Sequence, residues 1–344
     1  MIWLTWRQFR TQAMVAAAVL VLVAIALGST GPHLAHLYDS SGLLTCHAHG
    51  DCPSLAGNFF NSAKADTFIF RLWDGAIFLM FLVPALLGVF WGAPLITREI
   101  ETGTFRLAWN QSVTRTRWLA VKLGLLGLAA MVTTGLLSLM LTWWSNPVQR
   151  IAALVPSSDT VSRLLPVLFA TRGIAPVGYA AFAFALGVTV GVVIRRTVPA
   201  MAITLAIFAF VQVAFPLWIR PHLITPLRSS AVLLASNIQG LGESNGGKVS
   251  LFTSVAKPGA WVISNVTRTA SGHPFTGPPP TACSQNSGFQ TCANAIGRLH
   301  LRQLVTYQPT SRYWALQWYE TGIFLVLALL LAGLCFWWTR RRLS

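Results

Sequence analysis

The chain has 344 residues, of which 54% are hydrophobic and only 10% are charged. Soluble globular domains carry about 25% charged residues, so this chain has too few charges to cover a soluble surface of its size. Intrinsic disorder is also excluded, because disordered segments are poor in apolar and aromatic residues. The composition leaves an integral membrane protein. The net charge of +16 is therefore interpreted first as a signal of membrane orientation and not of nucleic-acid binding.

Six apolar segments are long enough to cross a bilayer, which takes about 20 residues of α-helix. They lie at about 12–28, 75–96, 118–143, 174–194, 198–219 and 315–338. Each is predicted to be a helix, because an open backbone cannot lie in lipid and the runs lack the alternation of barrel strands. The predicted fold class is an all-α polytopic membrane protein with six transmembrane helices. A small α+β extracytoplasmic segment is expected between spans five and six.

Basic residues predict the orientation, since they concentrate in short cytoplasmic segments. The segments at the N-terminus, 97–122, 195–197 and 339–344 together hold 12 of the 25 basic residues. These are Arg7, Arg10, Arg98, Arg106, Arg115, Arg117, Lys122, Arg195, Arg196, Arg340, Arg341 and Arg342. The others are spread over much longer segments. We therefore expect a multi-pass protein of the cell (plasma) membrane with both termini in the cytoplasm.

Four of the five cysteines form two close pairs on the face assigned as outside. Disulfides persist in oxidising compartments, so we predict the bridges Cys46–Cys52 and Cys283–Cys292. Cys335 lies within the sixth span. The loop from Cys46 to Cys52 also holds His47 and His49, so a zinc or copper site is the alternative to a plain disulfide-closed loop. We favour the disulfide and predict no metal.

The N-terminal residues Trp3, Trp6, Arg7 and Arg10 precede the first span. A secretory signal peptide is one interpretation, and an interfacial helix leading into an uncleaved span is the one we favour. Three predicted regions follow from the spans and the segments between them. The first region, 1–219, holds the interfacial helix, spans one to five and a cytoplasmic element at 97–117. The second, 220–314, is an extracytoplasmic domain. The third, 315–344, holds the sixth span and a basic cytoplasmic tail.

The outer segments are expected to contain both helix and strand. Within 220–314 the pattern predicts a helix over Ser229–Leu241, strands over Val249–Val255 and Trp261–Thr267, and a turn from Gly277 to Pro280. An amphipathic helix at the membrane surface is expected around Val161–Ala170.

Residues Gly242–Val249 fit the spacing of a phosphate-binding loop, G-x-x-x-x-G-K. Such a loop needs Ser or Thr next, a strand before it and a helix after it. Val249 follows instead and no clear strand precedes, so a flexible turn is favoured.

The span interiors hold almost no charge, although such charges mark proton relays and catalytic groups. Lys122 and Glu320 are expected to reach the interface, and Gln212 is the most central polar side chain apart from Ser and Thr. No chain of Asp, Glu or His crosses the membrane, so a proton-driven transporter would lack its coupling groups, while a sodium site built from carbonyls stays open as an alternative. No catalytic constellation of an intramembrane protease is present. The chain is therefore predicted not to be an enzyme and to take its energy from a partner.

The stretch from Thr97 to Trp109 is the most informative cytoplasmic segment, since it places two acidic residues within a basic face. Pro94 is expected to end the second span, and Gly103 permits a break between two short helices. A solvated turn is one interpretation. The other is a docking element for a cytoplasmic partner, with apolar anchors and charges that set specificity.

Glu99-Ile100-Glu101-Thr102-Gly103-Thr104 resembles the E-x-E-x-G-T element that follows the second span in permeases of exporter-type ABC transporters. These are six-span, type V exporter subunits, and the resemblance follows the span order over nearly the whole chain. The C-terminal stretch is similar to that of actinobacterial permeases. It comprises Tyr307-Gln308-Pro309, Arg312, Trp314, Gln317, Glu320, Phe336-Trp337-Trp338 and Arg340–Arg342.

The resemblance implies a pair of permeases that binds two copies of a separate cytoplasmic ATPase, which carries ATP and Mg; this chain would hold no cofactor. The second copy could be the same chain or another. The element at 97–117 would couple to the ATPase through Arg98, Glu99, Glu101, Gly103, Thr104 and Arg106. In relatives the second and fifth spans line the substrate cavity. Here those spans offer Phe78, Phe81, Phe90, Phe208, Gln212 and Phe215.

The function expected from this resemblance is ATP-driven export of a hydrophobic or amphipathic substrate through the membrane. The alternative is a multi-span receptor or scaffold with an extracytoplasmic ligand-binding domain. The small-residue pair Gly187-x3-Gly191, which permits close helix packing, and prolines in three spans are more than an anchor needs. A membrane enzyme is the third possibility and lacks any recognisable catalytic group.

Overall fold

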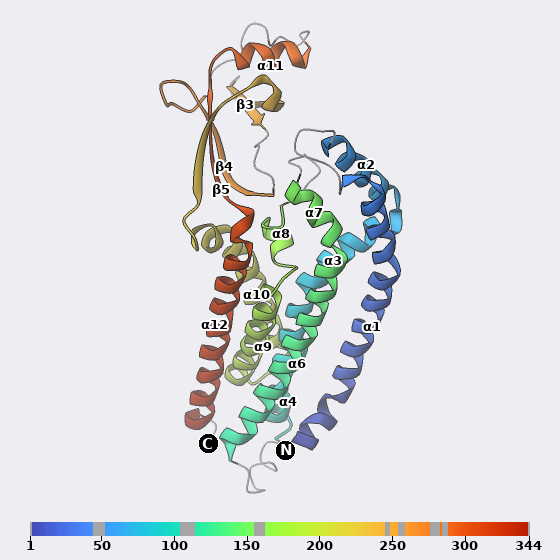
Figure 1. Cartoon of the computed structure of the whole chain (residues 1–344). Helices are drawn as coiled ribbons and strands as arrows, with labels where there is room; N and C mark the ends of the chain where they lie inside the picture. Colours follow the sequence, from blue (N-terminus) through green and yellow to red (C-terminus); the bar gives the residue numbers. More distant parts are fainter. Residues whose placement is uncertain are drawn as a thin grey trace. The chain divides into compact units, whose positions relative to one another are not determined.

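A computed structural model describes residues 2–43, 52–103, 114–154, 162–244, 248–253, 259–275, 283 and 288–342 of the chain. The chain forms two compact units. The membrane unit comprises 1–150, 165–223 and 314–344, and the sheet unit comprises 151–164 and 224–313. Figure 1 follows the elements along the chain and shows both termini at one end of the membrane unit, which we call the terminal end.

Six helical segments of the membrane unit are long and apolar enough to cross a bilayer, which confirms the predicted spans and fold class. In chain order they are α1 (Ile2–Ser40); α3 (Thr67–Leu86) with η2 (Leu87–Gly92) and α4 (Pro94–Glu101); α6 (Arg115–Trp144); α9 (Ala175–Ile194); α10 (Thr197–Ala214) with η3 (Phe215–Ile219) and η4 (Arg220–His222); and α12 (Tyr313–Arg342). The shorter helices are α2 (Cys52–Ala65), α7 (Asn146–Leu154) and α8 (Pro166–Phe169). Residues 2–10 continue into α1 without a break.

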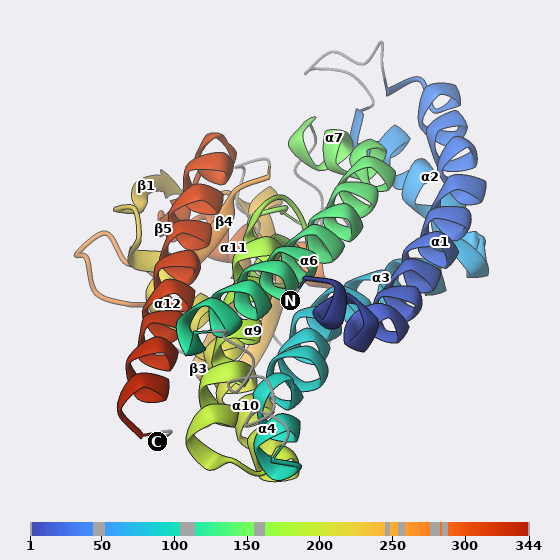
Figure 2. The ribbon, with the colours of Figure 1, turned by 90° about the horizontal axis from the view of Figure 1, so that it is seen from below.

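The helix α9 forms the centre of the membrane unit. Nearly all of its side chains are buried, and it packs against α3, η2, α4, α6 and α10. Figure 2 shows α9 between α6, α10 and α12. Its many Ala and Gly residues allow this, because small side chains let helix backbones approach closely. The helices α1, α10 and α12 instead expose most of their apolar surface.

The second span changes its helical geometry near its middle. The π-helical turn η2 is followed by Ala93, whose N–H donates to Gly88 O at 3.0 Å. The expectation that Pro94 ends the span is wrong. Pro94 lies in the first turn of α4. Backbone N–H groups in this turn have no intrahelical acceptor, so the N–H that proline lacks is not missed. The helix ends instead after Glu101, before Gly103, whose φ of 70° is a conformation that glycine adopts without strain.

The sheet unit contains an antiparallel sheet in the order β1-β5-β4 and a β2-β3 hairpin. The strands are β1 (Leu227–Val232), β2 (Ile238–Ser244), β3 (Lys248–Thr253), β4 (Trp261–Arg268) and β5 (Arg302–Gln308). The strands β3 and β4 confirm the two predicted ones. The predicted helix over Ser229–Leu241 is wrong, because β1 pairs with β5 far along the chain, with Ser229 opposite Val305. The local sequence pattern does not reveal that partner.

The segment before α8 belongs to the sheet unit up to Leu164. The guanidinium of Arg163 donates to Thr310 O at 3.2 Å and lies 4.5 Å from the ring centre of Tyr313. The surface helix predicted over Val161–Ala170 is wrong. Of its described residues, 162–170, only Pro166–Phe169 is helical, and the side chains of the last two residues of this helix are buried.

The disulfide Cys283–Cys292 is confirmed. Cys292 lies on α11 (Phe289–Gly297), in a small core with Leu233, Ile238 and Ile296. A staple of this kind suits a core of limited size. Cys52 is also disulfide-bonded, while Cys46 lies outside the described residues, so the pairing Cys46–Cys52 stays a prediction.

The segment with phosphate-loop spacing falls in the β2-β3 hairpin. A strand precedes it, contrary to expectation, but another strand and not a helix follows, which disfavours a phosphate-binding loop. Its middle residues 245–247 lie outside the described residues, as does the predicted turn from Gly277 to Pro280.

Candidate functional site

The helix α4 carries Arg98, Glu99 and Glu101 in its last two turns, at the terminal end of the membrane unit. Thr102 closes the helix, because its N–H and its hydroxyl both donate to Arg98 O, at 3.0 and 2.7 Å. Gly103 then turns the chain out of the helix. Thr104 and Arg106, which were predicted to belong to the same element, lie outside the described residues.

Glu99 forms a salt bridge with Lys122 of α6. The side chains are only 14% and 3% exposed, and the Lys122 ammonium lies 4.9 Å from the ring centre of Trp118. The expectation that Lys122 reaches the interface is therefore wrong. A buried charge without a partner is strongly destabilising, so this ion pair holds α4 against α6.

Glu101 binds the first residue of α10. One carboxylate oxygen accepts the Thr197 N–H at 2.8 Å, and the other accepts the Thr197 hydroxyl at 2.7 Å. The first amides of a helix lack intrahelical partners, and its N-terminus favours a negative charge. Arg196, at the N-cap position, supplies no side-chain cap. Glu101 therefore caps α10 from a different helix and ties α4 to it.

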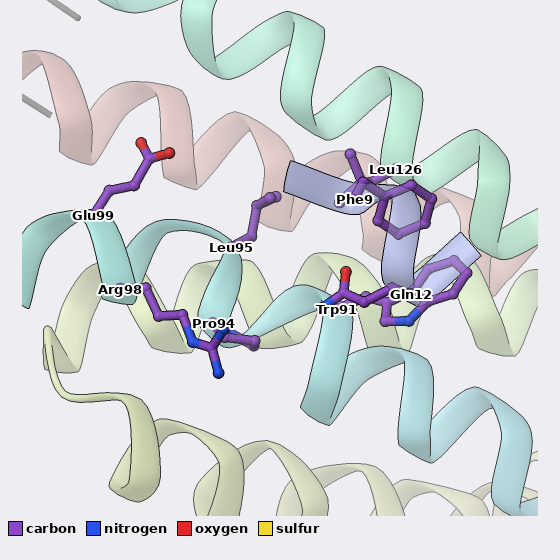
Figure 3. Close-up of a pocket in the computed structure, with 8 residues that line it drawn as sticks. All are labelled: Phe9, Gln12, Trp91, Pro94, Leu95, Arg98, Glu99 and Leu126. Carbon is purple, nitrogen blue, oxygen red and sulfur yellow. The ribbon is translucent and has the colours of Figure 1, made fainter. Parts of the chain in front are cut away.

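Arg98 is exposed, as is Glu101, and Arg98 lines a groove between α1, the second span and α6. The groove consists of two adjoining cavities of about 260 and 430 Å³, which share Gln12, Trp91, Pro94 and Arg98. Figure 3 shows Arg98 extending along α4 towards Pro94, while Glu99 points to the other side. Gln12 lies beside Trp91 in this view, and its side-chain amide donates to Phe90 O at 3.3 Å.

Glycines place η2 directly against α9. A Cβ at Gly187 would lie 2.2 Å from Gly88 O, and one at Gly92 would lie 2.6 Å from Phe184 O. Both distances are far below van der Waals contact, so only glycine fits. The pair Gly187-x3-Gly191 therefore acts in packing as the sequence suggested. Its counterpart Gly88-x3-Gly92 in the second span was missed, although the same four-residue spacing was visible there.

A second buried charge cluster joins the fourth, fifth and sixth spans at the end of the membrane unit away from the terminal end. The Arg220 guanidinium donates to both carboxylate oxygens of Glu320 at 2.7 Å, and the Tyr179 hydroxyl also donates to Glu320. Arg220 and Glu320 are 1% and 0% exposed. The expectation that Glu320 reaches the interface is wrong, and Arg220, assigned to the outer domain, belongs to the membrane unit.

Gln317, one turn before Glu320 on α12, fastens the start of α9. Its side-chain oxygen accepts the N–H groups of Ile174 and Ala175 at 3.0 and 2.7 Å, and its amide donates to Phe169 O and Arg172 O. The sequence resemblance included Gln317 and Glu320 without a role. Both bind neighbouring helices within the chain.

The structure does not gather the six predicted substrate-pathway residues at one place. Phe208 and Phe215 are buried, with Phe215 packed on Phe324. Phe78 and Phe90 are 67% and 52% exposed on the surface of the second span. The two others, Phe81 and Gln212, are half-buried. The Gln212 side-chain nitrogen is buried without a hydrogen-bond partner among the described residues.

A metal centre has no support in the described part of the chain, where no three His, Cys, Asp or Glu side chains are grouped to hold an ion. Most of the loop that raised the alternative of zinc or copper lies outside the described residues.

Six apolar helices, with a polar element at the end of the second, define a multi-pass membrane protein. The sequence model of the family described as ABC-2 membrane transporter related matches residues 17–220. That range covers more than half of the chain, with spans two to four and most of the first and fifth, and the chain belongs to this family. The family is a membrane component of ABC transporters and is not itself catalytic. Comparisons with curated proteins and with solved structures give no match.

Proposed function

We propose that the chain is the permease subunit of an ABC exporter and is energised by a separate ATPase that binds ATP and Mg. The observation that carries the proposal is the family match together with the bonds made by α4. Family membership implies an ATPase partner. The element expected to receive its motion is bonded to two other spans through Glu99 and Glu101.

The bonds of α4 suggest how the motion would spread. A displacement of α4 by the ATPase would pull on α6 through Lys122 and on the start of α10 through Thr197. The close η2–α9 contact would remain as the pivot, since packed glycines resist separation. The Arg220–Glu320 cluster would hold the far end of α10 against α12. In this account α10 tilts about its far end, and one conformation is favoured when nucleotide is bound.

The terminal end is proposed to face the cytoplasm. It carries the dense basic residues of the positive-inside rule, and both termini lie there. The disulfide of the sheet unit supports an oxidising compartment on the other side. The same reasoning supports the cell membrane as the location.

Two copies of the permease are proposed to form the pathway, together with two ATPases. The proposed substrate is hydrophobic or amphipathic. The apolar exposed surface of the second and fifth spans supports this choice, with Phe78 and Phe210 among its members. Whether the second copy is the same chain or another is left to the experiment below.

The test is affinity purification of the tagged chain from its native membranes, followed by mass spectrometry and an assay of Mg-ATP hydrolysis. We expect a protein with nucleotide-binding motifs to co-purify. We also expect the permease to alter the rate of ATP hydrolysis by this partner. Glu101→Gln should abolish that effect. The control Arg340→Gln, which changes an exposed charge of α12, should keep it. Purification without any nucleotide-hydrolysing partner would contradict the proposal.

A further inference from the structure

The groove has a charged end and an apolar length, and Figure 3 shows the residues of its smaller cavity, Arg98 among them. Arg98 lies at the end formed by α4, and the larger cavity continues past Val15 and Val19 of α1 and Leu86 of α3. Its volume of about 430 Å³ falls within the usual range of about 300–1,000 Å³ for small-molecule sites. The groove therefore has the shape and polarity of an amphiphile with one charged end.

The charge at this end is positive. Within the described residues the Arg98 side chain makes no hydrogen bond or ion pair. The Glu99 carboxylate is neutralised by Lys122. Glu101, one turn on, interacts electrostatically with Arg98, but both of its carboxylate oxygens accept hydrogen bonds from Thr197. Arg98 lies in the last two turns of the second span, the depth at which arginine side chains reach the lipid headgroups. An anionic group bound here would meet an exposed guanidinium able to form two parallel hydrogen bonds.

The groove is open to the side. Val15, Leu86 and Phe90 line it and are 66%, 38% and 52% exposed. On a membrane-spanning surface such residues face hydrocarbon and not water, so the molecules with direct access are those of the bilayer. A soluble anion would have no use for the apolar walls, and a neutral lipid would leave Arg98 without a partner.

We propose that this groove binds an acidic membrane phospholipid, with its phosphate-containing headgroup on Arg98 and one acyl chain along α1 and the second span. This assigns to Arg98 a lipid contact in place of the predicted ATPase contact. The bound lipid would contact Pro94 and Arg98 of α4, the helix whose other polar side chains bind α6 and α10. The site stands independently of whether an ATPase drives the chain.

The first test is native mass spectrometry of the purified full chain, titrated with phosphatidylglycerol or with phosphatidylcholine of the same acyl chains. We expect tighter binding of phosphatidylglycerol. Arg98→Gln should weaken it about fivefold, the effect of one basic residue at an anionic membrane surface. The matched control is Arg117→Gln, an exposed arginine at the start of α6 outside the groove, which should leave the affinity unchanged.

The second test fills the apolar part of the groove. Ala16 lines the cavity, while Ala18, on the same helix, is exposed and does not. Ala16→Trp should weaken phosphatidylglycerol binding, and Ala18→Trp should not.

Equal binding of the two lipids would overturn the proposal, as would an unchanged preference in Arg98→Gln or an equal loss in the Arg117→Gln control. None of these outcomes depends on hydrolysis or on a partner protein. A failure of this site therefore leaves the proposed exporter function standing, and the reverse also holds.

Discussion

Glu99 and Glu101 are two residues apart, yet their carboxylates bind different helices. Residues at this spacing do not face each other on an α-helix, so one points to Lys122 of α6 and the other to Thr197 of α10. The E-x-E spacing is thus suited to joining two neighbours through one short helix. A direct contact of both glutamates with a partner protein would compete with these bonds.

The Glu101 cap can be tested through the amide of Thr197. Glu101→Gln keeps the size of the side chain and removes its charge, so the Thr197 N–H should lose its charged acceptor. We expect faster hydrogen exchange at the Thr197 amide. Glu99→Gln is the control, because Glu99 binds a side chain of another helix and no amide of α10. Equal exchange rates in wild type and Glu101→Gln would contradict the cap.

The Glu99–Lys122 pair should behave as a buried ion pair. Removing one partner of such a pair costs about 3–5 kcal/mol, and we expect the low end for Glu99→Leu, since Glu99 keeps some solvent contact. The double variant Glu99→Leu/Lys122→Met should recover most of that loss, because no unpaired charge remains. Thermal unfolding in detergent measures both. A double variant less stable than Glu99→Leu alone would contradict the pairing.

At the scale of elements, the η2–α9 contact is set by backbone approach. The Cβ of Gly187→Ala would lie 2.2 Å from a backbone oxygen of Gly88, which cannot move away by rotating a side chain. We expect a loss of about 1–3 kcal/mol, as for other overpacked sites. Gly333→Ala on α12 is the control, since its Cβ meets open space and alanine favours the helix. A stability of Gly187→Ala equal to that of the control would contradict the contact.

The spans were predictable from sequence because each is one continuous apolar run, long enough to cross the bilayer without help from a distant segment. The sheet unit was less so, since β1 depends on its pairing with β5 about 70 residues later, a contact that no local pattern encodes. The sixth span illustrates the same limit at the site. In the sequence Glu320 is a residue near a helix end. Its partner Arg220 lies 100 residues earlier, in η4, and only the packing of the fifth span beside α12 brings the two together.

The charged residues of α4 stood out in the sequence, but their partners did not. The spacing of Glu99, Glu101 and Gly103 indicated a special segment after the second span. That Lys122 and Thr197 receive the two carboxylates depends on the packing of α4 beside α6 and α10. The binding of the two glutamates within the chain was not foreseen, and their coupling to an ATPase stays a prediction.

For the whole molecule, the proposed orientation can be tested on intact cells. The disulfide Cys283–Cys292 should be outside, and Cys335 is buried. A membrane-impermeant maleimide should label residues 283 and 292 only after mild reduction, without permeabilising the cells. A Cys292→Ser variant should leave the half-buried Cys283 free to react without reduction and serves as the control. Labelling that requires permeabilised cells would reverse the orientation.

The central claim is that an ATPase moves α4, and that α4 moves α6 and α10 with it. The most direct measurement is hydrogen exchange of the purified permease–ATPase complex with and without ATP under conditions that block hydrolysis. The account predicts that exchange changes together in α4, around Lys122 and at Thr197, and that Glu101→Gln removes the change at Thr197 alone. Exchange at these three places that does not respond to ATP would contradict it.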